Sequence, residues 1–159
     1  MAEFTYNPVQ VVQANQPVVL NNSIPCNKGY VYHRNESGIV TLRGIVNNAC
    51  GCFARYQVTF NGNIAIPTGG TAPAGISVAL ALDGEPILTS KAIVTPAAVA
   101  AEPPTDENYF NVTSTAIITV PKACCFNVSV ENTSAPADAA TPAPAINVKN
   151  ANLTVSRIA

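Results

Sequence analysis

The residues best suited to chemistry in this sequence are five cysteines at three sites: Cys26, the Cys50-Gly51-Cys52 pair, and the adjacent Cys124 and Cys125. We expect these sites to meet at one end of the fold. Thiols pack as small apolar groups, form disulfides or bind zinc. An odd number leaves one thiol unpaired within a chain or shared between chains. We favour buried free thiols, then disulfides within or between subunits, and last a zinc site, because no Cys-x-x-Cys pair is present.

Other catalytic or ligand-binding patterns are weak. His33 is the only histidine, and a Cys–His pair is a known nucleophilic arrangement, but its neighbours favour a strand residue beside tyrosines. The acids Asp106 and Glu107 are typical of a solvated loop, and Gly69-Gly70 lacks the Lys-Ser/Thr of a phosphate-binding loop. No Gly-x-Ser-x-Gly motif is present. We therefore predict no catalytic residue, no cofactor and no metal, and a protein that is not an enzyme.

The elements around these residues show a period of two, which is typical of β-strands. Apolar and polar residues alternate in the segments 56–60, 110–120 and 126–131, and the last of these places Glu131 on the polar side. In the segment 76–82, large residues alternate instead with Ser77, Ala79 and Ala81. We predict that this strand is buried on both faces, with the three small residues facing a second subunit.

Turn residues separate these strands. Asp83-Gly84 between two strand-like segments predicts a tight hairpin. Around Asn61-Gly62 the alternation continues, which favours a bulge, and a phase change near Asn150 predicts a bulge or a bend there. The Gly-, Ala- and Pro-rich segments 67–75, 95–105 and 135–145 are predicted to be loops. The fold class that follows is all-β, with about eight short strands that form either a sandwich or a jelly roll.

Composition limits the partners. The chain has 159 residues, enough for one core. Hydrophobic residues make up 48% and charged residues only 11%, so we expect subunit contacts to cover part of the surface. A net charge of −1 without basic clusters argues against nucleic acid, and the apolar segments are too short to cross a membrane. The first residues do not form a signal peptide, so we expect synthesis in a cytoplasm.

Three segments resemble the C1q/TNF-like jelly-roll family, in which the usual state is a tight trimer. They are Tyr56–Gly62, Ile76–Pro86 and Ala151–Ala159, and the last also resembles the C-terminal domains of spore-surface collagen-like glycoproteins. The whole chain, including 26–30 and 120–125, is similar to small prophage-encoded proteins of gut Firmicutes that are thought to be virion components. The resemblance implies a homotrimer whose axis is lined by small and aromatic side chains.

From this resemblance we expect an antiparallel jelly-roll sandwich of about eight to ten strands, with the jelly-roll domain over residues 23–159. Residues 1–22 are expected to be an N-terminal arm or first strand that could anchor the protein. An uncharged arm can add a strand to a neighbour's sheet edge, and its candidate anchoring residues are Asn7, Pro8, Val9, Val11 and Val12. The expected role is a trimeric decoration or head-fibre protein on the capsid surface of a tailed phage. Its expected partners are its own copies and the major capsid protein or another virion protein.

Two other roles remain open. One is a tip module that binds a receptor or carbohydrate on a host surface through the three loops, although these loops contain no Trp. The other is a spore or cell-surface structural protein that is cross-linked by its cysteines.

Overall fold

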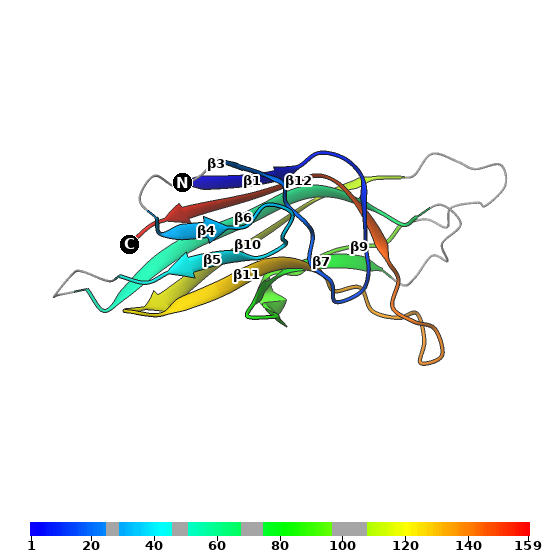
Figure 1. Ribbon diagram of the computed structural model, residues 1–159. Coiled ribbons are helices and arrows are strands. Elements are labelled where there is room, and N and C mark those ends of the chain that lie inside the picture. Colours follow the sequence, from blue (N-terminus) through cyan, green and yellow to red (C-terminus); the bar gives the residue numbers. More distant parts are fainter. Residues whose placement is uncertain (25–28, 46–50, 68–74, 97–107) are drawn as a thin grey trace.

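The computed structural model describes residues 1–24, 29–45, 51–67, 75–96 and 108–159 and consists of two six-stranded antiparallel sheets (Figure 1). The predicted all-β jelly-roll sandwich is confirmed. The structure has twelve strands rather than eight to ten, because several short strands of two or three residues extend the sheets. In the described part of the chain, no helix is long and apolar enough to cross a membrane.

The first sheet contains, in order, β10 (Phe110–Pro121), β6 (Phe53–Ala65), β12 (Ile146–Arg157), β1 (Ala2–Tyr6) and β3 (Asn22–Ile24), and β2 (Gln10–Val12) also pairs with β12. The second sheet contains β4 (Val31–His33), β5 (Val40–Arg43), β11 (Cys125–Asn132), β7 (Ile76–Leu82) and β8 (Glu85–Pro86), and β9 (Ala92–Val94) also pairs with β7. A short 3₁₀ helix, η1 (Leu88–Ser90), precedes β9.

The core lies between the sheets and follows from the alternation. On β6, Tyr56, Val58 and Phe60 are completely buried, while the residues between them face outward. On β10, Val112 and Val120 are buried in the same way. Each large apolar side chain removed from water contributes about 1.5–3 kcal/mol, so the two sheets are held together mainly by these inward-facing rows.

The long pair of β6 and β10 is regular from Phe53 opposite Pro121 to Ile64 opposite Phe110. The bulge predicted at Asn61-Gly62 is therefore wrong. Glycine is needed at position 62 for another reason, since a Cβ atom there would lie 2.7 Å from the Phe60 ring. The strand continues through this position because the aromatic ring fills the space that a side chain would otherwise take.

Both other turn predictions are confirmed. The register between β12 and β6 shifts between Lys149 and Asn152, and Asn150 has a φ of 53°, so the bulge lies where the phase of the sequence changes. Asp83 and Gly84 have φ values of 49° and 87° and join β7 to β8 in a two-residue hairpin. Positive φ at both central residues is typical of a type I′ turn, which matches the twist of the flanking strands.

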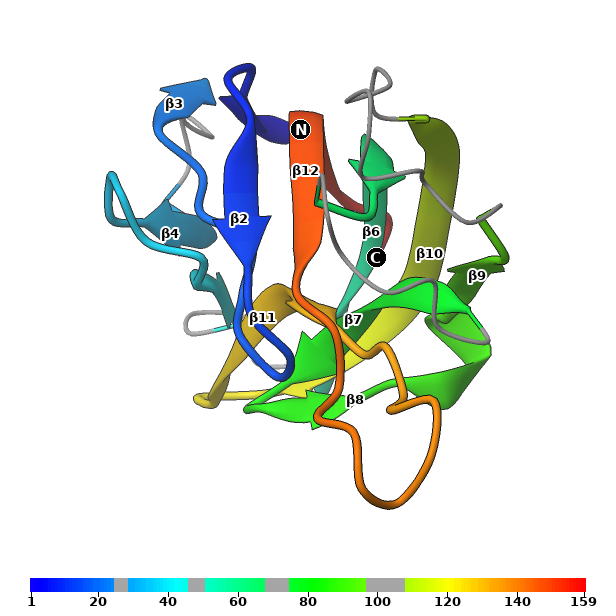
Figure 2. The same cartoon turned by 90° about the vertical axis from the view of Figure 1, so that its right-hand side faces the viewer.

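Residues 1–22 belong to the sandwich rather than forming a separate arm. β1 and β2 both pair with β12, and Figure 2 shows β2 beside β12. Phe4 is 2% exposed and Val18 is completely buried. The segment pairs within its own chain because it supplies apolar side chains to the core. Of the predicted anchoring residues, Val12 is buried, whereas Val9 and Val11 stay exposed at 47% and 60%.

Candidate functional surface

The outward side of the first sheet has uncharged polar side chains at its centre, with the charged Glu3, Arg55 and Lys149 around them. We call this surface, formed by the central parts of β6, β10 and β12, the neutral face. Its members are Gln57, Thr59, Asn61, Asn63, Asn111, Thr113, Thr115, Ile117, Thr119, Asn152, Thr154 and Ser156. None of these residues carries a charge, and all except Ile117 are amides or hydroxyls.

Side chains on the neutral face bind one another across the strands. Asn111 donates to the side-chain oxygen of Asn61 at 3.1 Å, and Asn61 in turn donates to the Thr113 hydroxyl at 3.1 Å. The Thr115 hydroxyl donates to that of Thr59 at 3.2 Å. Neutral groups that already have hydrogen-bond partners lose much less on removal from water than charges do. The neutral face can therefore be covered by another protein surface at low electrostatic cost.

Exposed apolar side chains lie on β10 and on the elements beside it. η1 and β9 contact β10, and Figure 2 shows β9 next to β10. Ile117 on the neutral face is 65% exposed and Leu88 in η1 is 76% exposed, while Ile93 on β9 is 63% exposed and lies opposite Ser77, on the outer side of the second sheet. Exposed apolar side chains beside a neutral polar surface are typical of protein–protein contact areas.

The sequence analysis did not select this surface, although a signal was present. The polar positions of the alternating strands are Asn, Thr, Gln and Ser rather than the Lys and Glu that usually solubilise a sheet. Low overall charge predicted a covered surface somewhere in the molecule. Only the register of β6, β10 and β12 shows that the uncharged positions share one face.

Of the cysteine sites, the structure describes Cys52, Cys124 and Cys125, and all three are free and exposed. Cys26 and Cys50 lie outside the described residues. The preferred interpretation as buried thiols is therefore wrong for these three cysteines, because they lie at strand ends and in the turn between β10 and β11. The backbone N–H of Lys122 donates to the Cys52 carbonyl at 2.9 Å, so Cys52 and the Cys124-Cys125 pair lie at the same end of the sandwich. Among the described residues, no group of three or more His, Cys, Asp or Glu side chains could hold a metal ion.

Ser77, Ala79 and Ala81 are already buried within one chain, at 2%, 0% and 0% exposure. The backbone N–H of Ser77 donates to the Ser134 hydroxyl at 2.9 Å, and Glu131 lies opposite Ala79 in the sheet. Small side chains on β7 thus make room for residues of the same chain. The prediction that they face a second subunit does not fit this burial, since they leave no surface for it.

His33 has a structural position. Its Nε2 lies 2.9 Å from the Ser37 carbonyl oxygen, and its ring packs 4.8 Å from that of Phe4. The neighbouring Tyr32 is 56% exposed and points away from this contact. In the part of the chain that the structure describes, no cysteine is shown in contact with the imidazole, so no Cys–His pair is formed there.

The three predicted loops differ in how much is described. Residues 68–74 and 97–107, which make up most of the first two, lie outside the described residues. In the third, the Thr141 side chain, followed by the backbone N–H groups of Ala140 and Thr141, lowers the pKa of the Asp138 carboxyl. The two backbone bonds measure 2.9 and 2.8 Å. This carboxylate stabilises a local turn in an exposed segment.

Comparisons with known proteins define the fold. No protein-family model and no curated protein matches the sequence. Among solved structures, the globular domain of zebrafish complement 1qA protein matches with a TM-score of 0.54 and 13% identity, over 96% of this chain and 94% of that chain. The structure of Eiger TNF from S. frugiperda matches with a TM-score of 0.51 and 12% identity, over 100% and 92%. The chain therefore has a C1q/TNF-like jelly-roll fold, and at this identity the likeness concerns the fold alone.

Proposed function

We propose that this protein is a non-enzymatic structural protein that assembles as a homotrimer through its neutral face and decorates the capsid of a tailed phage, on the shell or as a short head fibre. The observation that carries the proposal is the neutral face itself. Twelve uncharged side chains, among them the exposed Ile117, share one side of a sheet. Such a surface is suited to permanent contact with another copy.

Assembly through this face follows from its energetics. Contact between copies removes Ile117 from water, which is favourable in proportion to the apolar area. It desolvates amides and hydroxyls, most of which keep their bonds to each other, while the Glu3 carboxylate that accepts from Asn152 at 2.6 Å lies on β1, beside the face. In a closed ring of three copies, each copy contacts the next, so the neutral face of every copy is covered. The C1q/TNF-like fold also supports the trimer through the family resemblance.

The capsid role rests on two supports. The sequence resembles small prophage-encoded proteins, and Val9 and Val11 are exposed on the segment around β2, which pairs with β12 beyond the central part that belongs to the neutral face. We propose that these two valines contact the major capsid protein or another virion protein. The protein would then be made in the bacterial cytoplasm and would act on the virion by adhesion and reinforcement.

A matched pair of variants tests the assembly. Native mass spectrometry of the wild type is expected to show three times the 16.5 kDa mass of the chain. Asn61→Arg places three like charges in the contact and is expected to weaken association at least about tenfold, which corresponds to about 1.4 kcal/mol. Asn35→Arg makes the same change at an exposed turn outside the face and should leave the trimer intact. A monomeric wild type, or a trimer that tolerates Asn61→Arg, contradicts the proposal.

The capsid contact has its own test. Purified protein is mixed with empty shells that lack it and sedimented. We expect saturable binding that Val11→Asp abolishes while the trimer persists in native mass spectrometry. Failure of the wild type to bind any shell, together with a clear hit on a glycan array, overturns the capsid role in favour of a binding module. That outcome leaves the trimer measurement unaffected.

A further inference from the structure

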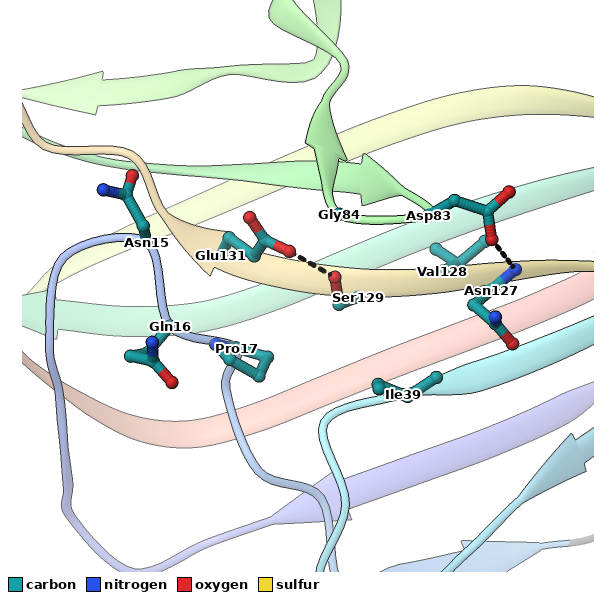
Figure 3. A pocket seen from close by; sticks show the side chains of 10 residues that line it. All are labelled: Asn15, Gln16, Pro17, Ile39, Asp83, Gly84, Asn127, Val128, Ser129 and Glu131. Atoms are coloured by element: carbon teal, nitrogen blue, oxygen red, sulfur yellow. Dashed lines mark hydrogen bonds between the residues drawn. The ribbon is translucent and has the colours of Figure 1, made fainter.

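A pocket opens on the second sheet, on the side opposite the core. β11 pairs with β5 up to the position where Val128 lies opposite Val40. Beyond this point its neighbour is the segment 15–18, which we call the strap. The N–H of Val18 donates to the Val130 carbonyl at 2.7 Å, and the N–H of Asn15 donates to that of Asn132 at 2.8 Å. Between the end of the pairing with β5 and the start of the pairing with the strap, a pocket of about 470 Å³ lies beside Ser129 (Figure 3).

The pocket contains a buried carboxylate. Glu131 is only 8% exposed, and its Oε1 accepts a hydrogen bond from the Ser129 hydroxyl at 2.8 Å. Figure 3 shows the second carboxylate oxygen directed away from Ser129. No Lys, Arg or His is among the described residues that line the pocket. A carboxylate that is removed from water without a counter-ion is costly, so a cation that enters the pocket is bound favourably.

A second carboxylate lies at the other end. Asp83, in the β7–β8 hairpin, accepts the backbone N–H of Asn127 at 2.9 Å and is exposed. Asn127 and Glu131 are four residues apart on an extended strand, a separation of about 13 Å. The pocket is therefore elongated along β11 and has an acidic group at each end. Asn15 and Gln16 from the strap also line the pocket, and both side chains are uncharged amides.

We propose that this pocket binds an organic cation with N–H donors, an ammonium or guanidinium group, with Glu131 as its counter-ion and Asp83 as a second, weaker attraction for the far end of the ligand. The shared chemistry fits a free amine and equally a Lys or Arg side chain of a partner protein. The pocket lies on the second sheet and the neutral face on the first, so this inference does not depend on the proposed trimer.

The geometry favours an organic cation over a metal ion or a sugar. Calcium takes six to eight oxygen ligands, whereas the two carboxylates of this pocket lie at opposite ends of it. Sugars are held largely by stacking on aromatic rings, and none of the described lining residues is aromatic. Directed N–H donors suit a carboxylate oxygen flanked by amide side chains, since each donor finds a separate acceptor.

The test is a titration of the full chain with agmatine, which carries a guanidinium and an ammonium group. Binding is monitored by NMR, through the backbone amide signals of Ser129 and Glu131. We expect saturable changes in the chemical shifts of these amides in the wild type. In Glu131→Gln we expect a dissociation constant that is larger by at least about tenfold. The variant keeps the side-chain length and an oxygen that accepts from Ser129. Glu85→Gln removes the same charge at an exposed position in β8 and should bind like the wild type. The amide spectrum itself verifies that each variant is folded.

Further titrations distinguish the two possible sources of the ligand, a free amine and a side chain of a partner protein. A short Arg-containing peptide that binds more tightly than agmatine assigns the site to a partner's side chain, and the reverse order assigns it to a free amine. No saturable shift with either probe overturns the proposal. Equal binding to Glu131→Gln also overturns it, as does a calcium titration that produces the same shifts while agmatine produces none.

Discussion

The two outer faces of the sandwich follow the same alternation but differ in what covers their outward residues. On the first sheet, outward side chains such as Asn61 and Thr115 are exposed and bind only one another. On the second sheet, Ser129 and Glu131 also point away from the core, yet they are buried at 6% and 8% exposure. The strap covers this side and leaves the pocket. Alternation thus decides which way a side chain points, and the connections between strands decide whether it meets water.

The largest expected effect is at Asn132, which follows Val128 and Val130 on the inward side of β11 and lies opposite Val78. Asn132 is completely buried, its Nδ2 donates to the carbonyls of Val12 and Pro144, and its Oδ1 accepts the N–H of Ser134. Asn132→Ala leaves these groups without partners, so we expect the free energy of unfolding to fall by about 3 kcal/mol. Urea unfolding, monitored by circular dichroism, measures this change in the free energy of unfolding.

The matched control is Asn61→Ala on the neutral face, where water replaces the lost hydrogen bonds. At the lowest workable protein concentration, where mass action disfavours assembly, we expect a change below about 0.5 kcal/mol. Equal losses for the two variants would mean that the buried amide of Asn132 stabilises the fold no more than the exposed amide of Asn61 does.

A second prediction concerns the layer beneath the neutral face. Gly62→Ala places a methyl group 2.7 Å from the ring of the buried Phe60. Because overpacking forces the ring or the strand to move, we expect a loss of about 1–3 kcal/mol in the free energy of unfolding, read from the same urea transitions. A neutral result would show that β6 is loosely packed and that the face does not rest on a rigid core.

A third prediction concerns the support of Glu131. Ser129→Ala removes the one hydroxyl that donates to this buried carboxylate. We expect a loss of about 1–2 kcal/mol in the free energy of unfolding. Ser156→Ala on the neutral face is the control, with a change below about 0.5 kcal/mol. If Ser129→Ala proves as mild as the control, Glu131 is solvated more than its burial indicates.

The smallest effect is expected at Asp138, which lies on neither face. Its pKa is lowered in the folded protein by the Thr141 side chain and the N–H groups of Ala140 and Thr141. A lowered folded pKa contributes stability above the unfolded pKa, and this contribution is lost as the pH falls through the folded pKa. Asp138→Ala should lower Tm slightly at about pH 7 and leave it unchanged at about pH 2. A difference that persists at the acidic pH would mean that the side chain acts through packing instead.

Much of the fold was predictable from the residues, for local reasons. Alternation along β6 and β10 indicates their inward rows, Asp83-Gly84 indicates the hairpin and the phase change indicates the bulge at Asn150. Local patterns do not show which strands are neighbours. They placed a bulge at Asn61-Gly62, where the Phe60 ring explains the glycine, and they left open whether residues 1–22 form an arm or a first strand, whereas Phe4 and Val18 contribute to the core.

The functional surfaces were less predictable because each needs the register. The neutral face exists only when β6, β10 and β12 lie side by side. The burial of Glu131 depends on the strap, which lies more than a hundred residues away along the chain. Ser77, Ala79 and Ala81 were correctly placed in a strand buried on both faces, but the covering residues come from the same chain.

The most direct test of the central claim, that the neutral face is covered by other copies, compares two isoleucines. In the single chain Ile117 on this face is 65% exposed, and Ile39 on the second sheet is 48% exposed. Hydroxyl-radical labelling of the native protein, read by mass spectrometry, is expected to modify Ile117 more slowly than Ile39. Faster modification of Ile117, in the order of the single-chain exposures, would contradict the account.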